Sequence, residues 1–287
     1  MPNVAIVTDS TTSLPNEIFQ SLDIHWVAYY IHREKETLRD LVTVQRAEFY
    51  QWLPTATVLP RTACPGPGDY AEMYECLAHT GISEIVSIHM TSKGSGAFQA
   101  ATIARDMLQA KMPHVRIRVI DTLNTSVCHG WMVIEAARAA RQGKSLDEIA
   151  QIVDKMIPIT RMIQTADTLK YLYMGGRIGK AKHLVGTLLN IKPLIGMEQG
   201  VIVPLGQARS RSQAYVAMVD LIEAAVGKMG AIKIAYVHAA AIEEAKKIQT
   251  LVEQRFVCVE SFIAELSPAL GVHTGPGTAG VCYFPVD

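Results

Sequence analysis

Val4–Thr11 (VAIVTDST) is an apolar run that ends abruptly in hydroxyl groups and a carboxylate. A short apolar run between polar boundaries is typical of a buried strand. The same pattern returns at Glu84–His89 and Arg116–Ile120, and helix-like segments separate these runs. Because strands that alternate with helices form parallel sheets with crossover helices, the sequence predicts an α/β fold.

The second half of the chain continues the alternation and adds a hairpin signal. Gln199-Gly200 separates two β-like runs within Ile191–Arg209, which predicts a β-hairpin. A chain of 287 residues is long for a single core. We therefore expect two α/β lobes, residues 1–160 with a mainly parallel sheet and residues 161–287, and segment 54–80 is a candidate for crossing between them.

Local patterns predict several further elements. The β-branched and aromatic run Ile24–Ile31 indicates one more strand. Helical spacing predicts a helix over Thr43–Leu53, capped by its first residue, and another over Lys182–Asn190. Ser145 with Glu148 three residues later predicts a capping box at a helix start.

Composition excludes several classes of protein. Lys plus Arg and Asp plus Glu both number 27, which argues against a broad nucleic-acid-binding surface. The sequence shows neither a basic signal-peptide region nor an apolar stretch near the roughly 20 residues of a membrane span, so we expect a cytoplasmic protein. The five cysteines lack a C-x-x-C pair, so we expect no disulfide framework and no metal site.

Four more polar and glycine-rich motifs follow apolar runs. They are Thr62–Pro65, Thr91–Gly96, Gly175–Gly179 and His273–Gly277. Ligands of α/β sheets bind outside the carboxyl ends of the strands. Hydroxyls, free backbone N–H groups, a histidine and an arginine together predict a site for an anionic ligand.

Each candidate residue has a functional and a structural interpretation. Asp9 suits a nucleophile or a Mg²⁺ ligand, or else it caps the following turn. Ser95 opens a helix as a ligand donor or as its cap, and Lys93 and Ala97 disfavour the G-x-S-x-G elbow of hydrolases. His273 precedes a rigid Gly-Pro-Gly turn, where a histidine can hydrogen-bond a carboxylate.

Two arginines belong to the same set of candidates. Arg177 follows paired glycines in a predicted sharp turn and projects either onto an oxyanion or into solvent. Arg209 and Arg211 form a phosphate-binding or partner-binding patch, or else a solvated face.

Taken together, these motifs resemble those of the DegV family of bacterial fatty-acid-binding proteins. The resemblance covers essentially the whole chain in the same order. Its most specific stretch is Asp167–Leu172 running into Gly175–Ile178, and Leu188–Pro193 and Gly271–Gly277 continue it. It implies two α/β lobes of the DegV (EDD) type that hold a long-chain fatty acid between them.

The resemblance also implies a role for individual residues. Thr62, Ser95 and His273 correspond to the family's carboxylate-binding side chains, with the Gly96 backbone nearby. Family members are acyl-carrying subunits that present the fatty acid to a separate ATP-dependent fatty acid kinase, which makes an acyl phosphate. Arg177 and Arg209 then belong to the acyl-phosphate or kinase-docking surface.

This reading implies a lipid carrier without catalytic residues or a cofactor of its own. It is compatible with transient membrane contact, and we expect a monomer.

The chain departs from the family pattern near the predicted head group. Ala63, Gly94 and Ala97 replace residues of the Thr-Ser-x-Pro and Leu-Ser-Gly-Thr motifs, and Gln207 and Gln213 stand where lysines are common. Two other functions therefore remain open. One is an autonomous phosphatase or hydrolase that uses Asp9 or Ser95 with His273. The other is a lipid-binding regulator without a kinase partner.

Overall fold

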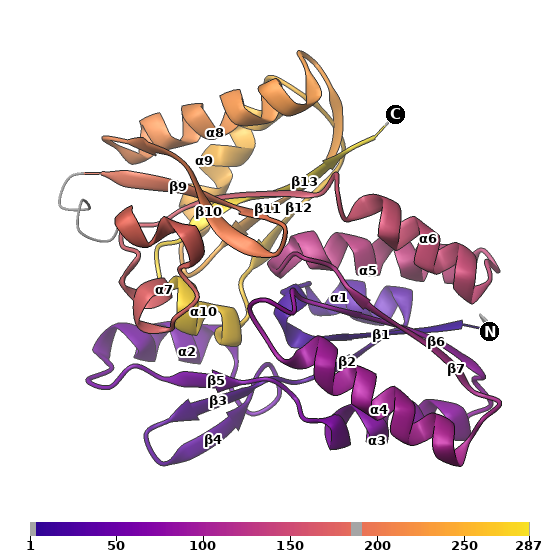
Figure 1. The fold of residues 1–287 in the computed structure, drawn as a ribbon. Coiled ribbons are helices and arrows are strands. Elements are labelled where there is room, and N and C mark those ends of the chain that lie inside the picture. Colours follow the sequence, from indigo (N-terminus) through magenta and orange to yellow (C-terminus); the bar gives the residue numbers. More distant parts are fainter. Residues whose placement is uncertain (1–3, 185–190, 287) are drawn as a thin grey trace.

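The computed structural model describes residues 4–184 and 191–286, which form three β-sheets with helices around and between them (Figure 1). The first sheet is parallel, with the strand order β2-β1-β6-β7. Its strands are β1 (Val4–Asp9), β2 (Ile24–Val27), β6 (Glu84–His89) and β7 (Arg116–Asp121). Every residue of β1 is buried, as expected for a strand that is covered on both faces.

Five helices surround this sheet. They are α1 (Asn16–Leu22), α3 (Pro67–His79), α4 (Ala97–Lys111), α5 (Ser126–Arg141) and α6 (Leu146–Met156). Helix α3 packs against α4, and α5 packs against α6 and β1. The predicted capping box is confirmed, because Ser145 Oγ accepts from the Glu148 N–H and Glu148 Oε2 accepts from the Ser145 N–H.

A small antiparallel sheet corrects the expectation of one strand over Ile24–Ile31. Its order is β4-β3-β5, and its strands are β3 (Tyr30–Arg33), β4 (Glu36–Arg39) and β5 (Arg61–Ala63). The apolar run divides at Ala28-Tyr29, because β2 pairs with β1 whereas β3 pairs with β4 and β5. A run of apolar residues gives no sign that the chain changes its pairing partner.

Helix α2 (Arg46–Trp52), which continues into the 3₁₀ turn η2 (Leu53–Thr55), starts later than expected. The cap residue is Gln45, so the predicted cap at Thr43 is wrong. Thr43 Oγ1 instead accepts from the Arg39 N–H at 2.7 Å and closes the turn before the helix.

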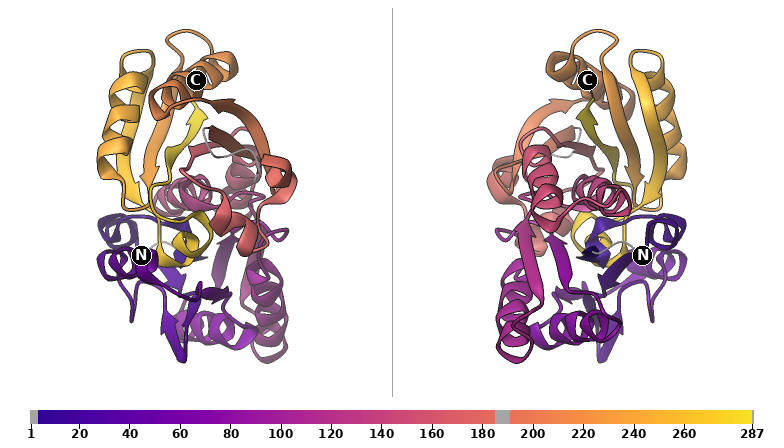
Figure 2. Two further views of the ribbon diagram at one scale, coloured as in Figure 1. Left: turned by 90° about the vertical axis from the view of Figure 1, so that its left-hand side faces the viewer. Right: turned by 90° about the vertical axis from the view of Figure 1, so that its right-hand side faces the viewer.

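The third sheet is mixed and has six strands in the order β10-β9-β8-β13-β11-β12. Its strands are β8 (Arg161–Thr165), β9 (Lys192–Glu198), β10 (Val201–Ala208), β11 (Ala231–His238), β12 (Val257–Glu265) and β13 (Ala279–Pro285). The predicted hairpin at Gln199-Gly200 is confirmed, since β9 and β10 pair antiparallel across it. Helices α8 (Arg211–Val226) and α9 (Ile242–Glu253) pack on this sheet together (Figure 2).

Helix α5 lies between the parallel sheet and the six-stranded sheet. It contacts β1 and β6 on one side and β13 on the other, and its side chains are buried almost all round. Trp131 Nε1 donates to the Cys282 carbonyl oxygen at 3.1 Å. One core cluster therefore runs from β1 through α5 to β13.

Short helical segments complete the space between the sheets. They are η1 (Ser10–Thr12), α7 (Lys170–Met174), the 3₁₀ turn η3 (Gly179–Leu184) and α10 (Pro268–Thr274). His273 thus lies in a helix, whereas the sequence indicated only a rigid turn. Ser267 caps α10 by accepting from the Leu270 N–H, and Pro268 occupies its first position.

Part of the predicted helix Lys182–Asn190, and of the motif Leu188–Pro193, lies outside the described residues. Within 4–184 and 191–286, no helix is long and apolar enough to cross a membrane. Over the same ranges, no three His, Cys, Asp or Glu side chains gather where a metal ion could bind.

Candidate functional site

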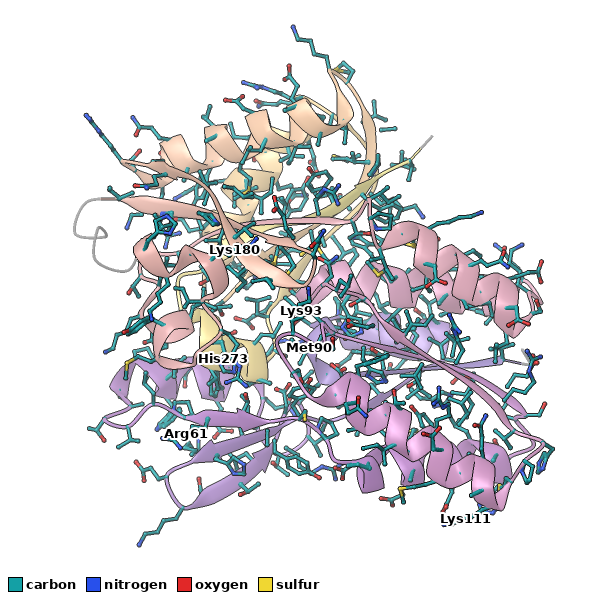
Figure 3. All side chains as sticks on the ribbon, in the orientation of Figure 1. Arg61, Met90, Lys93, Lys111, Lys180 and His273 are labelled. Carbon is teal, nitrogen blue, oxygen red and sulfur yellow. The ribbon has the colours of Figure 1, made fainter. Side chains whose placement is uncertain are left out.

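A cavity of about 350 Å³ lies between the parallel sheet, helix α10 and the β9–β10 hairpin. Its volume falls within the range of small-molecule sites. His273 on α10 and Met90 at the end of β6 both line it, and Figure 3 labels them between the two large sheets. The cavity therefore lies at the carboxyl ends of the parallel strands, where α/β sheets bind ligands.

Much of the cavity wall is aliphatic. Side chains from the six-stranded sheet, α7 and α10 form this part: Met162, Leu172, Ile195, Met197, Ile202 and Leu270. Three of the chain's 12 methionines line the cavity, namely Met90, Met162 and Met197. Their flexible thioethers adapt to an apolar ligand of irregular shape.

Thr62 and His273 meet on the wall of this cavity, although 211 residues separate them in the chain. Strand β5 carries Thr62 and the last turn of α10 carries His273. The Thr62 Oγ1 and His273 Nε2 atoms lie 2.8 Å apart. The sequence-predicted pair is thus brought together.

The His273 imidazole is held neutral. Burial, followed by the nearby positive charge of Arg177, lowers the pKa of His273 to about 4. A Cβ at Gly175 would lie 2.3 Å from His273 Nδ1, so only glycine permits this close approach. His273 is therefore an uncharged hydrogen-bonding group at physiological pH.

Ser95 and Gly96 line the cavity at the start of α4. Ser95 Oγ accepts from the Ala97 N–H at 3.2 Å, which satisfies one free donor of the helix terminus. The same oxygen lies 2.6 Å from the Tyr29 hydroxyl oxygen. The cap residue of α4 is Gly96, so the interpretation of Ser95 as the cap is wrong, and Ser95 lies one residue before the cap on the cavity wall.

The two candidate arginines are placed differently. Arg177 lines the cavity with an exposed side chain, and its Nη1 donates to the Gly175 carbonyl oxygen at 2.7 Å. Arg209 is exposed at the end of β10 and does not line the cavity. Its neighbour Arg211 is engaged by Asp167 through Nη2, at 2.6 Å. Arg209 and Arg211 therefore do not form one patch of two free arginines, because Arg211 is paired with Asp167.

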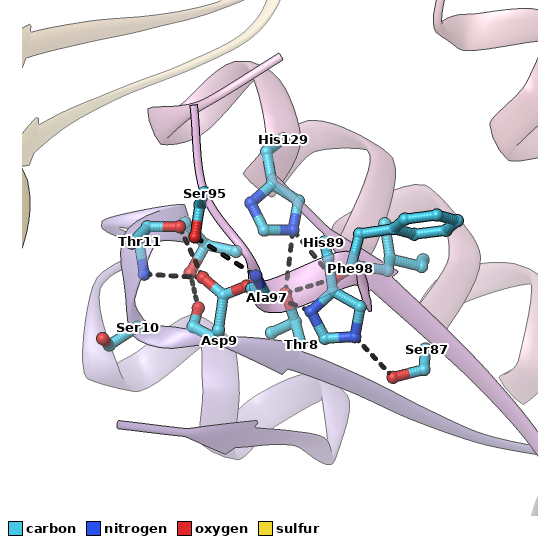
Figure 4. Close-up of polar contacts among 12 residues, drawn as sticks. Thr8, Asp9, Ser10, Thr11, Ser87, His89, Ser95, Ala97, Phe98 and His129 are labelled. Carbon is cyan, nitrogen blue, oxygen red and sulfur yellow. Dashed lines mark hydrogen bonds and ion pairs between the residues drawn. The ribbon is translucent and has the colours of Figure 1, made fainter. Parts of the chain in front are cut away.

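Asp9 belongs to a buried polar network behind the cavity (Figure 4). Its Oδ1 accepts from the Thr11 N–H at 3.0 Å and from the Thr11 hydroxyl, while Oδ2 lies 3.1 Å from His89 Nδ1. Burial raises the pKa of Asp9, but His89 and His129 outweigh it and keep the pKa below its usual value. The carboxylate therefore caps the turn after β1, as the structural interpretation of Asp9 predicted.

This arrangement does not favour a hydrolase. Asp9 is fully buried and does not line the cavity. His273 Nε2 pairs with Thr62, and Ser95 pairs with Tyr29. His273, the base of the hydrolase alternative, is therefore paired with Thr62 and not with Asp9 or Ser95.

Sequence reasoning did not identify Tyr29 or Thr11 as cavity residues. Tyr29 lies inside an apolar run, and an aromatic residue there is equally typical of a strand core. No signal in the sequence marks Tyr29, because the change of sheet at Ala28-Tyr29 is visible only in the pairing of the strands. Thr11 belonged to a recognised hydroxyl cluster in which no single position was distinguished.

Comparison with known proteins identifies close relatives. A family model described as "Uncharacterised protein, DegV family" matches residues 3–286. A DegV domain-containing protein from Caldanaerobacter subterraneus subsp. tengcongensis is 30% identical over 283 residues, 99% of each chain. Protein DegV of Bacillus subtilis is 29% identical over 282 residues, 98% of this chain and 99% of its own.

Solved structures share the fold over their full length. A structure described as fatty acid binding of a DegV family protein from Thermus thermophilus matches with a TM-score of 0.91 and 27% identity, over 99% of both chains. The crystal structure of DegV, a fatty acid binding protein from Bacillus subtilis, matches with a TM-score of 0.88 and 27% identity, over 100% of both chains.

Proposed function

The chain belongs to the DegV family, and from that premise we propose that it binds a long-chain fatty acid in the cavity between its sheets. The observation that carries the proposal is the composition of the cavity. Aliphatic and methionine side chains line much of it, and uncharged hydrogen-bonding groups gather at Thr62, Ser95 and His273. The related proteins of Thermus thermophilus and Bacillus subtilis are described as binding fatty acids.

The energetics of such a ligand fit this composition. An acyl chain gains about 0.8 kcal/mol for each buried CH₂ group. Its carboxylate is costly to bury unless hydrogen bonds replace its hydration. We assign this role to Thr62, Ser95, His273 and the Gly96 backbone N–H.

The tautomer of the neutral imidazole decides whether Thr62 donates or accepts in its bond with His273. With the proton on Nε2, His273 donates to Thr62 Oγ1, so the Thr62 hydroxyl proton is free for a carboxylate oxygen. Ser95 supplies a second hydroxyl from the start of α4. The site then offers donors to an anion without burying a full positive charge.

We further propose that the bound carboxylate is presented to a separate ATP-dependent fatty acid kinase. Arg177 is exposed and lines the cavity, so it is our candidate contact for the acyl phosphate. Arg209, exposed at the end of β10, is our candidate for the docking surface of the kinase. We place this carrier in the cytoplasm as a monomer that exchanges its ligand by transient membrane contact.

Residues on both sides of position 160 line the cavity, such as Ser95 and His273. This supports the proposed division into lobes 1–160 and 161–287, with the ligand held between them. The crossing of segment 54–80 stays a prediction.

Native mass spectrometry followed by denaturation and extraction tests the proposal. We expect one fatty acid per chain, lost in the Ser95→Ala/His273→Ala double variant. The matched control is Ser92→Ala/His114→Ala, which changes two exposed residues and should retain the lipid. Wild-type protein that is empty and takes up neither oleate nor palmitate would refute fatty-acid binding.

A second assay separates the carrier from a regulator. Acyl-phosphate formation from the loaded protein, ATP and a fatty acid kinase should fall in Arg177→Ala while lipid retention persists. A loaded wild-type protein whose bound fatty acid no acyl kinase phosphorylates would instead identify a lipid-binding regulator.

A further inference from the structure

Tyr29 reaches the serine of the predicted carboxylate site from a separate part of the chain. It lies between β2 and β3, is 4% exposed and lines the cavity. Its hydroxyl oxygen lies 2.6 Å from Ser95 Oγ. This contact connects the segment between β2 and β3 to the start of α4.

Either hydroxyl could donate in this contact, and its surroundings favour the Tyr29 hydroxyl as the donor. Burial raises the pKa of the Tyr29 phenol well above its usual value, so the phenol keeps its proton. A buried O–H group needs an acceptor, and Ser95 Oγ is the neighbour within hydrogen-bonding distance. The protonated phenol and its burial thus favour Tyr29 as the donor and Ser95 Oγ as the acceptor.

The direction of this bond determines what Ser95 can do. Ser95 Oγ then accepts twice, from the Tyr29 hydroxyl and from the Ala97 N–H. A hydroxyl has two lone pairs and one proton, so both acceptor positions are occupied. Only the Ser95 proton remains, and it is available to a group in the cavity.

We propose that Tyr29 is a positioning residue that fixes Ser95 as a hydrogen-bond donor and thereby selects acyl ligands with an anionic oxygen head group. The inference rests on the proposed fatty-acid binding and deepens it. A donor-only serine favours a carboxylate over an alcohol, because hydrogen bonds to a charged acceptor are about twice as strong as neutral ones. Tyr29 also supplies a hydroxyl beside Ser95, where Ala97 provides none.

A double-mutant cycle with two ligands tests this role. Palmitate and 1-hexadecanol have the same chain length and differ in the head group. We expect Tyr29→Phe to weaken palmitate binding by about 3- to 10-fold, the range of one hydrogen bond, and hexadecanol binding by less than about 2-fold. In the Ser95→Ala background, Tyr29→Phe should have no further effect, because Tyr29 acts through Ser95.

Tyr30→Phe is the matched control, because its hydroxyl donates to Asp69 Oδ1 at 2.8 Å and Tyr30 does not line the cavity. It should leave both affinities unchanged. Equal losses for the two ligands, or additive losses in the cycle, would overturn the inference, since a purely structural tyrosine would produce them.

Urea unfolding without ligand keeps the two proposals apart. It is measured for the wild type, Tyr29→Phe, Ser95→Ala and the double variant. A non-additive change in the free energy of unfolding is expected from the Tyr29–Ser95 bond alone. Wild-type protein that binds neither ligand would refute the proposed function and the selectivity of Tyr29 with it. Wild-type protein that binds palmitate while Tyr29→Phe keeps the same selectivity would refute the inference alone.

Discussion

Gly175 controls the position of His273 through the absence of a side chain. A Cβ there would come within 2.3 Å of His273 Nδ1 and 3.1 Å of the Tyr171 carbonyl oxygen. We predict that Gly175→Ala displaces the imidazole from Thr62 and weakens fatty-acid binding by about tenfold, equivalent to about 1.4 kcal/mol. Displacement of a fluorescent fatty acid measures the effect.

The matched control is Gly68→Ala on α3, where an added Cβ meets nothing within 4 Å. That variant should bind as the wild type does. Normal binding by Gly175→Ala would show that His273 does not need its present position.

The pKa of His273 makes stability depend on pH. Its pKa is about 4 in the folded chain, against 6.5 for an ordinary histidine. Because the folded pKa lies below the unfolded one, the contribution to stability is complete above pH 6.5 and is lost as the pH falls toward 4. We predict that His273→Gln flattens the pH dependence of the free energy of unfolding by up to about 1.4 kcal/mol per pH unit in this window.

His238 is the matched control, since burial also lowers its pKa to about 4 and it does not line the cavity. His238→Gln should flatten the profile while lipid retention persists. A His273→Gln profile as steep as that of the wild type would contradict the neutral imidazole.

Among single residues, the sequence could predict polar side chains that interrupt or follow apolar runs. Thr62, Ser95 and His273 are conspicuous for this reason, and the structure places all three on one cavity. Tyr29 is not conspicuous, because its ring packs as an ordinary core residue and only its hydroxyl reaches Ser95. Such a contact depends on tertiary structure.

At the scale of elements, the tip of the β9–β10 hairpin closes one side of the cavity. Thr91 Oγ1 donates to the Gly200 carbonyl oxygen at 3.0 Å, and both residues line the cavity. A Cβ at Gly200 would lie 2.3 Å from Thr91 Oγ1, at a φ of +81°. We predict that Gly200→Ala detaches the tip and speeds dissociation of the fatty acid several-fold, as measured by stopped-flow fluorescence.

Gly206→Ala, on β10 of the same hairpin, provides the control. Its added Cβ would make an ordinary contact with Leu194 Cδ1 at 3.6 Å. Dissociation should keep the wild-type rate in this variant. An unchanged rate in Gly200→Ala would mean that the ligand leaves by another route.

Elements with strong local signals could be predicted from the sequence, and elements defined by distant partners could not. The turn Gln199-Gly200 and the Ser145–Glu148 capping box were predicted because neighbouring residues encode them. Helix α10 was missed because it is short and glycine-containing. It also contacts Asp40, far away in the sequence, which accepts from the Ala269 N–H at 3.2 Å.

At the scale of the whole molecule, Asp40 joins the turn after β4 to α10. It is fully buried, and burial raises the pKa of its carboxyl to about 6 from 3.8. Because the folded pKa lies above the unfolded one, the contribution to stability is present below pH 3.8 and is lost as the pH rises through 6. We predict that Asp40→Asn gains stability relative to the wild type between pH 4 and 6, by up to about 1.4 kcal/mol per pH unit.

Urea unfolding at pH 4, 5, 6 and 8 measures this difference. Asp154→Asn is the matched control, because it removes the same charge from the exposed face of α6. A constant difference between Asp40→Asn and the wild type across this range would contradict the raised pKa.

The position of β13 has a consequence for synthesis of the protein. This strand comes late in the sequence and lies between β8 and β11. While residues 279–285 remain inside the ribosome, those two strands have unpaired edges facing each other. Because unpaired edges invite association with other chains, the nascent protein should present a binding site for chaperones until that segment emerges.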